Sequence, residues 1–198
     1  SDLLHGCAVL GTGGGGSLEK GLELVNKDIE NGKTFNIISI SELPDEGYIA
    51  TPYGCGAPKE DKEELDVDSN FKYLPQLEDS SAVLAFKQLE KYMSKKFCAV
   101  SSTELGGENT AEALHIAAIL NLPIVDADPA GRAVPELQHS TYFIENMPIY
   151  PLSVATKFGE SIIFENVCND FRAEEMIRAI AVASDNEVGV TDHPMTGK

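Results

Sequence analysis

Short apolar runs alternate with stretches of helical periodicity along most of this chain of 198 residues. The first unit is the clearest: an apolar run at residues 7–10 precedes a glycine run at 11–16, and a stretch with one apolar helical face follows at 18–29. Another apolar run at 35–40 completes a strand, helix, strand unit. This alternation predicts an α/β fold in which helices flank a mostly parallel, Rossmann-like sheet. Because this length suits one hydrophobic core, we expect a single α/β domain over residues 1–198.

The later elements are predicted from the same periodicities and from turn residues. Between residues 41 and 80 the strand and helix periodicities become weak around several prolines, which predicts a long connecting segment. An acidic run at 60–68 lies within this segment. Two β-rich segments near the C-terminus flank a turn at 158–160 and predict a β-hairpin. The end of the chain, 191–198, has no stop signal, so we expect a longer architecture whose C-terminal domain is absent here. The predicted strands cover 7–10, 35–40, 48–52, 97–101, 122–126, 152–157 and 161–165, and the predicted helices cover about 18–30, 80–95, 109–120, 133–145 and 172–183.

Acidic residues outnumber basic residues about two to one in this chain. It has 15 Lys and Arg against 32 Asp and Glu, which gives a net charge of −17. Such a surface has few cations to replace the counterions of a nucleic-acid backbone or to bind an anionic membrane. We therefore expect no nucleic-acid partner and no membrane partner.

Cysteine spacing and hydropathy indicate the compartment. The four cysteines include no C-x-x-C pair, which argues against a zinc knuckle and against a disulfide framework. The longest apolar run is too short to cross a bilayer, and the N-terminus has no charged region that leads into a hydrophobic stretch. These features predict a cytoplasmic protein.

The glycine run at 11–16 is followed by Ser17, a residue type that favours the N-cap of a helix. Its spacing satisfies G-x-G-x-x-G, and backbone N–H groups in such a turn can approach an anion at the positive end of a helix dipole. One alternative is a nucleotide or dinucleotide site, although its acidic residue, Glu42, comes later than the usual ~20 residues after the loop. The other alternative is a purely structural tight turn. The residues predicted to bind the substrate here are Gly13, Gly14, Gly15 and Gly16.

A second polar turn, at residues 103–109, also leaves a predicted strand and enters a predicted helix. Its glycines permit close backbone approach, while Glu104 and Asn109 bring a carboxylate and a carboxamide to the carboxyl edge of the sheet. We assign Glu104 a catalytic role, in which either Glu104 or Asp128 is the base, and we assign Asn109 a substrate-binding role. In the alternative interpretation, Glu108 and Asn109 only cap the helix.

A third polar turn follows the predicted strand at 122–126. Asp126 and Asp128 are two residues apart, and Arg132 lies within a turn of them. Two carboxylates beside a guanidinium can hold a polar substrate, and their repulsion can raise the pKa of one of them. We assign catalytic roles to Asp128 and Arg132 and a substrate-binding role to Asp126. The alternatives are an Asp turn that pairs with Arg132, or a metal site completed by His139, but we predict no metal and no cofactor.

Cys55 stands between two glycines, in the sequence Tyr-Gly-Cys-Gly-Ala-Pro. A cysteine in this setting is accessible as a nucleophile where a base lies near, but the sequence contains no sign of a lowered thiol pKa. The other interpretation is a glycine-rich rim of the active site, and we place Cys55 among the substrate-binding residues. His115 is expected to be a packed helix residue, and His139 and His193 lack the short spacings of metal ligands.

The three polar turns at 11–17, 103–109 and 126–132 all stand at predicted junctions of a strand and a helix. Because the carboxyl ends of parallel strands meet at one edge of a sheet, we expect these turns to share one crevice. The predicted partner in that crevice is a small-molecule substrate, and a homo-oligomer is left open.

Taken in order, these motifs resemble a family long labelled domain of unknown function 917 and now called S-methyl thiohydantoin desulfurase-like, whose genes often accompany hydantoinase and oxoprolinase relatives. The resemblance covers nearly the whole chain but only the N-terminal part of a typical member. It implies an α/β N-terminal domain and the removal of a sulfur substituent from a five-membered thiohydantoin ring. The motifs that carry it are the glycine run at 11–17, the Gly-x-Gly-Ala-Pro loop at 54–58, Glu104-x-Gly-Gly-x-Asn109, and Asp126-Ala-Asp-x-x-Gly-Arg-Ala-x-Pro-Glu-Leu-Gln138.

We therefore expect an enzyme that acts on a hydantoin-like or thiohydantoin-like cyclic substrate by hydrolytic desulfuration or a related hydrolysis. Attack at the carbon that bears sulfur requires a base, together with donors for the ring oxygen and nitrogens. One alternative is a nucleotide-binding or dinucleotide-binding domain that uses the glycine run. Another is a non-catalytic fragment whose site is completed by further sequence or by another subunit.

Overall fold

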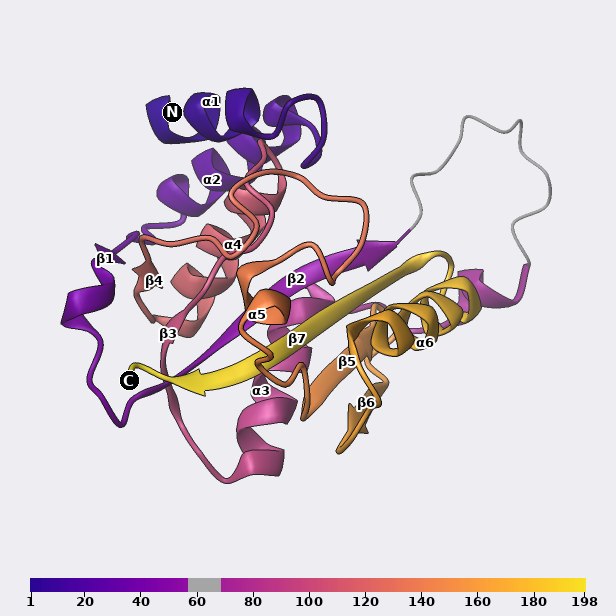
Figure 1. Cartoon of the computed structure of the whole chain (residues 1–198). Coiled ribbons are helices and arrows are strands. Elements are labelled where there is room, and N and C mark those ends of the chain that lie inside the picture. The colour runs from indigo at the N-terminus through magenta and orange to yellow at the C-terminus, as the bar shows by residue number, and fades with distance from the viewer. Residues whose placement is uncertain (57–68) are drawn as a thin grey trace.

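A seven-stranded sheet forms the centre of the molecule in a computed structural model that describes residues 1–56 and 69–198 (Figure 1). The acidic run at 60–68 lies outside the described residues. The strands are β1 (Ile37–Ile38), β2 (Tyr48–Gly56), β3 (Phe97–Val100), β4 (Ile124–Val125), β5 (Leu152–Thr156), β6 (Ser161–Phe164) and β7 (Glu187–Thr196). The α-helices are α1 (Asp2–Leu10), α2 (Leu18–Glu30), α3 (Ser81–Met93), α4 (Asn109–Leu120), α5 (Thr141–Ile144) and α6 (Asp170–Ala183), and short 3-10 helices cover Ile40–Glu42 and Ser69–Tyr73.

The sheet is mixed, in the order β1-β4-β3-β2-β7-β5-β6. β1, β4, β3 and β2 pair in parallel, whereas β7 is antiparallel to both of its neighbours, β2 and β5. β5 and β6 form the hairpin that the sequence predicts. The α/β fold is therefore confirmed, but the expectation of a mostly parallel sheet holds for one half only, and a Rossmann-like arrangement is not confirmed.

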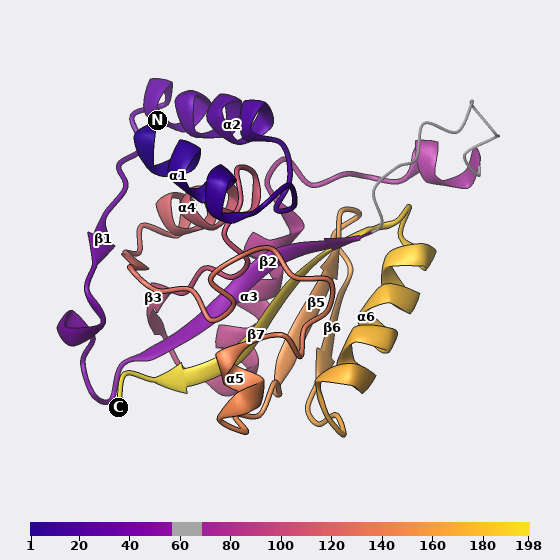
Figure 2. The ribbon, with the colours of Figure 1, turned by 45° about the horizontal axis from the view of Figure 1, so that its top comes forward.

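Helices cover both faces of the sheet. Alternate side chains of β2 point to opposite faces of the sheet, as the two-residue period of a strand requires, and so contact the helices on both faces. Ala50 packs with Phe86 of α3 and Leu114 of α4, whereas Tyr53 and Cys55 pack in the cluster that α6 covers. Figure 2 shows α1, α2 and α4 together near one end of the sheet, and α6 beside β5 and β6 near the other. None of the helices within 1–56 and 69–198 is both long and apolar enough to span a membrane.

The predicted strand at residues 7–10 is wrong, because these residues form the last turns of α1. Leu4 and Cys7 are buried and stand three residues apart, so one side of α1 packs against the core. An apolar run this short fits a strand as well as a buried helix segment, and periodicity alone does not separate the two. The glycine run consequently connects two helices.

The predicted helix at 133–145 is also wrong, apart from the single turn of α5. Carboxylates from other elements take the backbone donors of this segment: the Val134 N–H donates to Glu104 Oε2 at 3.2 Å, and the Leu137 N–H donates to Glu174 Oε2 at 3.2 Å. Pro135 between them has no N–H. The segment therefore follows an irregular path that lines the candidate site described below.

β7 includes C-terminal residues for which the sequence analysis predicts no strand, only a chain end without a stop signal. Gly189 and Pro194 interrupt its pattern, and strand formers alone do not identify it. The strand forms because it lies between β2 and β5 and buries Val188 and Val190 completely.

Candidate functional site

The glycine run packs against the turn that begins α4, and the two helix starts cap one another. The Gly15 carbonyl accepts hydrogen bonds from the N–H groups of Glu108 and Asn109, at 3.0 and 3.1 Å. In return, Glu108 Oε2 accepts the N–H of Ser17 at 2.9 Å. The dinucleotide interpretation requires a strand before the glycines, and α1 occupies that place.

The other side of the glycine run faces the segment after β4. A Cβ on Gly14 would lie 2.7 Å from the Cβ of Ala133. Arg132 is exposed and donates to Thr12 Oγ1 at 3.1 Å and to the Ala133 carbonyl at 3.2 Å. Within the described part of the chain, Arg132 forms no ion pair with Asp126 or Asp128, so the Asp turn paired with Arg132 is not seen.

In the described structure, Asp128 is held by hydrogen bonds from backbone N–H groups rather than by ion pairs with charged side chains. Its Oδ1 accepts the N–H groups of Ala130, Gly131 and Glu104, at 2.9, 2.7 and 3.2 Å. Asp126 and Asp128 line a cavity of about 150 Å³ beneath α1, and neither of them lines the cavity that holds Cys55 and Glu104. Among residues 1–56 and 69–198, no three His, Cys, Asp or Glu side chains are arranged to hold a metal ion, and Asp126, Asp128 and His139 form no such group.

Three of the predicted site residues do come together. Cys55, Glu104 and Asn109 line a cavity of about 180 Å³ between β2, the start of α4 and α6, which we call the outer cavity. The predicted glycines Gly13, Gly14, Gly15 and Gly16 are not among its lining residues. Its other polar side chains are Tyr53, Glu136, Glu174 and Arg178. Of the three polar turns expected to share one crevice, only the turn at 103–109 lines this cavity, so the predicted shared crevice is not found.

Glu104 is held in place by backbone contacts on both sides. Its φ of 60° is in the left-handed region, which is costly for a side chain of this kind. Its Oε2 accepts the Val134 N–H, and its carbonyl accepts Asn109 Nδ2 at 3.2 Å. Burial raises the pKa of Glu104, the hydrogen bond from Val134 opposes that rise, and the charges of Asp128 and Glu174 add to it. A carboxyl with a raised pKa in a cavity is a candidate proton acceptor.

Cys55 is not activated as a nucleophile, because the pKa of its thiol is raised rather than lowered. Burial, and after it the charge of Glu174, raises the pKa of its thiol to about 11. A thiol with this pKa is almost entirely protonated at neutral pH, and the thiolate is the reactive form. The structure therefore favours the interpretation of Cys55 as part of the rim.

The sequence reasoning missed Glu174 and Arg178, which face the outer cavity from α6. Arg178 Nε donates to Glu174 Oε1 at 2.5 Å, and a terminal guanidinium nitrogen donates to the Pro135 carbonyl at 3.4 Å. The signal that could have identified the pair is the Glu and Arg spacing of one helical turn.

The sequence reasoning also missed a buried cluster formed by Tyr53, Asp170, Asp192 and His193, which we call the His193 cluster. The Tyr53 hydroxyl donates to Asp192 Oδ2 at 2.6 Å. Asp192 Oδ1 lies 2.9 Å from His193 Nδ1, and His193 Nε2 lies 3.7 Å from Asp170 Oδ1. The last two atoms are buried and have no hydrogen-bond partner in the described structure. A carboxylate therefore lies on each side of the imidazole.

A bulge in β7 explains how neighbouring residues join one cluster. Ile49 and Thr51 of β2 stand opposite Met195 and Asp192, so β7 carries one extra residue here. His193 has a φ of 43°, in the left-handed region. Side chains of consecutive residues in a regular strand point to opposite faces, but the bulge lets Asp192 and His193 interact directly. Such bulges often re-aim side chains beside active sites.

The charge state of His193 follows from its surroundings. Burial lowers the pKa of His193, but the Asp192 and Asp170 carboxylates outweigh burial and raise it to about 9. The Tyr142 ring lies beside the imidazole at a centroid distance of 4.5 Å, with the two ring planes tilted by 32°. His193 is therefore an imidazolium at neutral pH.

The His193 cluster adjoins the outer cavity. A smaller hollow of about 20 Å³, the inner cavity, is lined by residues that include Tyr142, Asp192 and His193. Tyr53 and Glu104 line both cavities. The two cavities thus meet at Tyr53 and Glu104, which line both.

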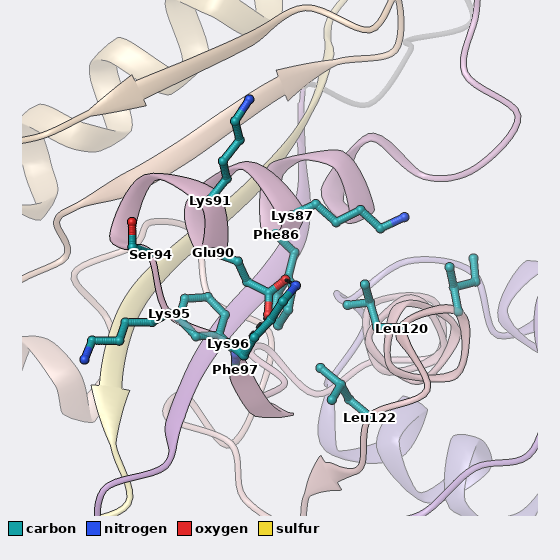
Figure 3. A pocket seen from close by; sticks show the side chains of 11 residues that line it. Phe86, Lys87, Glu90, Lys91, Ser94, Lys95, Lys96, Phe97, Leu120 and Leu122 are labelled. Carbon is teal, nitrogen blue, oxygen red and sulfur yellow. Dashed lines mark hydrogen bonds and ion pairs between the residues drawn. The ribbon is translucent and has the colours of Figure 1, made fainter.

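A larger hollow, of about 900 Å³, lies elsewhere, between the C-terminal ends of α3 and α4 (Figure 3). Phe97, the first residue of β3, lines it, so it lies at the opposite end of that strand from Glu104. Lys87, Lys91 and two further lysines surround it, and cations near the C-terminal end of a helix complement its dipole. No residue predicted for the site lines this hollow.

Comparisons with known proteins identify the family. No curated protein matches the chain. The X-ray structure of a protein from Chromobacterium violaceum is similar, with a TM-score of 0.77 and 25% sequence identity, over 98% of this chain and 52% of that chain. This chain thus spans about half the length of that protein. The family model for the S-Me-THD-like N-terminal domain matches residues 1–166, and the chain therefore belongs to the S-Me-THD-like family.

Proposed function

We propose that the outer cavity binds a thiohydantoin-like ring and that Glu104 acts as the base in the hydrolytic removal of its sulfur substituent. Membership of the S-Me-THD-like family supports a thiohydantoin-related substrate. The observation that carries the proposal is a carboxyl of raised pKa at the junction of two cavities, with Tyr53 and Asn109 beside it. A cavity of about 180 Å³ suits a small ring better than a dinucleotide.

The reaction needs only water as its second substrate. Water adds to the ring carbon that bears the S-methyl group, Glu104 takes one water proton, and the ring nitrogen of the C=N bond gains a proton from a second, solvent water. The C–S bond then breaks, and sulfur leaves with the bonding electrons and the proton held by Glu104. The hydroxyl proton passes to the hydroxide left by that solvent water as the ring carbonyl forms, so that hydantoin and methanethiol are the products. A positioned carboxylate base of this kind contributes about 10²–10⁴ in rate.

Asp128 and Arg132 enter this proposal in different ways. Asp128 is the alternative base, although its Oδ1 is held by three backbone donors. Arg132 is held at Thr12 and is proposed to orient the glycine run next to the third polar turn. Cys55 and Asn109 are proposed to line the bound ring.

Turnover of an S-methyl thiohydantoin, followed by ultraviolet absorbance, tests these roles. Glu104→Gln is expected to lower kcat by about 10²–10⁴, because the amide cannot take a proton from water. Asp128→Asn retains an oxygen acceptor for the backbone donors and is expected to lower kcat less than tenfold. Glu145→Gln, at an exposed glutamate after α5, is the control and should turn over at the wild-type rate.

Two outcomes would overturn the assignment. Undiminished turnover in Glu104→Gln removes Glu104 as the base, and a larger loss in Asp128→Asn transfers that role to Asp128. Turnover that is absent from the 198-residue chain and present in a longer chain supports the fragment alternative, in which further sequence completes the site.

A further inference from the structure

Tyr53 is the member of the His193 cluster that reaches the outer cavity. It is half-buried, it lies on β2 two residues before Cys55, and it lines both cavities. Its hydroxyl is 2.6 Å from Asp192 Oδ2. Asp192 lines the inner cavity and not the outer one, so the Tyr53 hydroxyl is hydrogen-bonded toward the inner cavity.

The Tyr53 hydroxyl uses its single proton to donate a hydrogen bond to Asp192. An ionised carboxylate is only an acceptor, so a phenol beside it must be the donor. The His193 imidazolium lies on the other side of Asp192, where Nδ1 is 2.9 Å from Asp192 Oδ1. Burial, followed by the charge of Asp192, raises the pKa of Tyr53 well above its ordinary value, so the phenol keeps its proton at neutral pH.

A phenol has one proton and two acceptor positions. With the proton of Tyr53 directed to Asp192, its oxygen has only acceptor capacity left for a ligand. We propose that Tyr53 selects the substrate by accepting a hydrogen bond from a ring N–H group, so that the site takes cyclic amides that carry an N–H and rejects those alkylated at that nitrogen. This inference rests on the proposed function, because it concerns the ligand of the same cavity.

The other polar groups of the outer cavity point to the same chemistry. Glu104, Glu136 and Glu174 are acceptors when ionised, and one of the two N–H donors of Asn109 Nδ2 is used on the Glu104 carbonyl. Arg178, the guanidinium of this cavity, is bound to Glu174. The cavity therefore presents more acceptors than free donors, which suits a ring with N–H groups.

Binding measurements with three probes test this selection without turnover. The probes are hydantoin, 1-methylhydantoin and 3-methylhydantoin, titrated into the 198-residue chain by calorimetry. We expect wild type to bind hydantoin at least tenfold more tightly than one of the two methylated probes, because that probe cannot donate to Tyr53. Tyr53→Phe keeps the ring and removes the acceptor, so this ratio should fall to less than threefold. Tyr73→Phe, at an exposed tyrosine, should keep the wild-type ratio.

Asp192→Asn provides a second test that does not remove the hydroxyl. The imidazolium Nδ1 of His193 requires an oxygen, so the carboxamide oxygen faces His193 and the NH₂ group faces Tyr53. The Tyr53 oxygen then accepts from Asn and its proton is free to turn toward the cavity. The preference for the N–H probe should be lost or reversed in Asp192→Asn, an effect that a merely structural role of Asp192 would not produce.

The outcomes separate this inference from the proposed function. An unchanged probe ratio in Tyr53→Phe and Asp192→Asn overturns the inference, even where wild type turns over thiohydantoins. A ratio that depends on Tyr53 supports the inference, even where Glu104→Gln retains full turnover and the proposed base is wrong. Failure of wild type to bind any of the three probes overturns both.

Discussion

His193 combines two costly features, a left-handed backbone and a buried charge. Its side chain is only 4% exposed, and its φ is 43°. Strain of this kind persists only where surrounding contacts determine the conformation, and it concentrates at functional sites. The contacts here are carboxylates from two elements, Asp170 of α6 and Asp192 of β7. One side chain thus joins the bulge of β7 to the start of α6.

The raised pKa of His193 makes the stability of the fold depend on pH. The folded state raises this pKa from 6.5 to about 9, so the stabilisation is complete below about pH 6.5 and is lost as pH rises through about 9. Wild type should lose up to about 3 kcal/mol of unfolding free energy between pH 6 and pH 9.5 because of this group. Urea unfolding at both pH values measures the loss.

His193→Gln is the comparison for that experiment, since it removes the titrating group. Its stability should be lower than that of wild type at pH 6 and should change less between the two pH values. Equal pH dependence in the two proteins would show that other groups, such as the Cys55 thiol, cause the loss.

Gly15 is needed for the close approach of two backbones. A Cβ there would lie 2.5 Å from Gly106 Cα, and its φ is +78°. Gly15→Ala should therefore lower the free energy of unfolding by about 2–4 kcal/mol, from backbone strain and from the clash. Gly13 also has a positive φ, of +95°, but a Cβ there has no atom within 4 Å. Gly13→Ala should cost only the strain of about 1 kcal/mol, and equal costs in denaturant unfolding would contradict this account.

At the level of elements, the start of α2 is capped by a side chain from the start of α4. Glu108 Oε2 accepts the Ser17 N–H, a donor that the first turn of α2 leaves without a partner. Glu108→Ala should lower the free energy of unfolding by about 1–2 kcal/mol. Glu23→Ala, at an exposed position inside α2, is the control and should change it by less than about 0.5 kcal/mol. A neutral Glu108→Ala in thermal unfolding would show that the bond contributes nothing.

The same contact explains what the glycine motif could and could not predict. Ser17 was expected to cap α2, and its side chain does accept the Lys20 N–H at 3.3 Å. The pattern G-x-G-x-x-G describes glycine spacing but not the element before it, so it gave no evidence that α1 is a helix. The run therefore serves helix packing in the structure, where the sequence also allowed anion binding.

Elements whose local pattern agrees with their packing were predicted well. α3, α4, α6 and the β5–β6 hairpin lie within a few residues of their predicted bounds. β7 and the irregular segment before α5 were missed because distant partners determine them. β7 is held by β2 and β5, and Val134 is held by the Glu104 carboxylate. Propensity does not contain such long-range information.

The residues of the candidate site also separate into those that local patterns predict and those that distant contacts determine. Cys55, Glu104 and Asn109 were predicted from turns next to strands, and the structure brings these three together. Asp192 and His193 could not be predicted, because a regular strand would point them to opposite faces and the bulge is not encoded in a known motif. The adjacent Asp, His and Pro residues in a predicted C-terminal segment were the available signal.

On the scale of the whole molecule, the net charge of −17 continues into the candidate site. The outer cavity brings three glutamates, Glu104, Glu136 and Glu174, near one guanidinium, and the inner cavity brings Asp192 near one imidazolium. The long-range field and these local charges together disfavour an anion at the site. A neutral ring that donates N–H groups meets no such repulsion, which agrees with the selection proposed for Tyr53.

The family model ends at residue 166, but the fold needs the rest of the chain. Residues 167–198 supply α6, which covers a core cluster, and β7, which lies between β2 and β5. A chain of residues 1–166 would leave two strand edges unpaired and Val154 uncovered, so we expect it to unfold without a cooperative transition and to bind a dye for exposed apolar surface. A chain that lacks only the exposed Lys198 should unfold like wild type. A cooperative urea transition of the 1–166 chain would show that β2 and β5 find another arrangement, and that the central position of β7 is not required for folding.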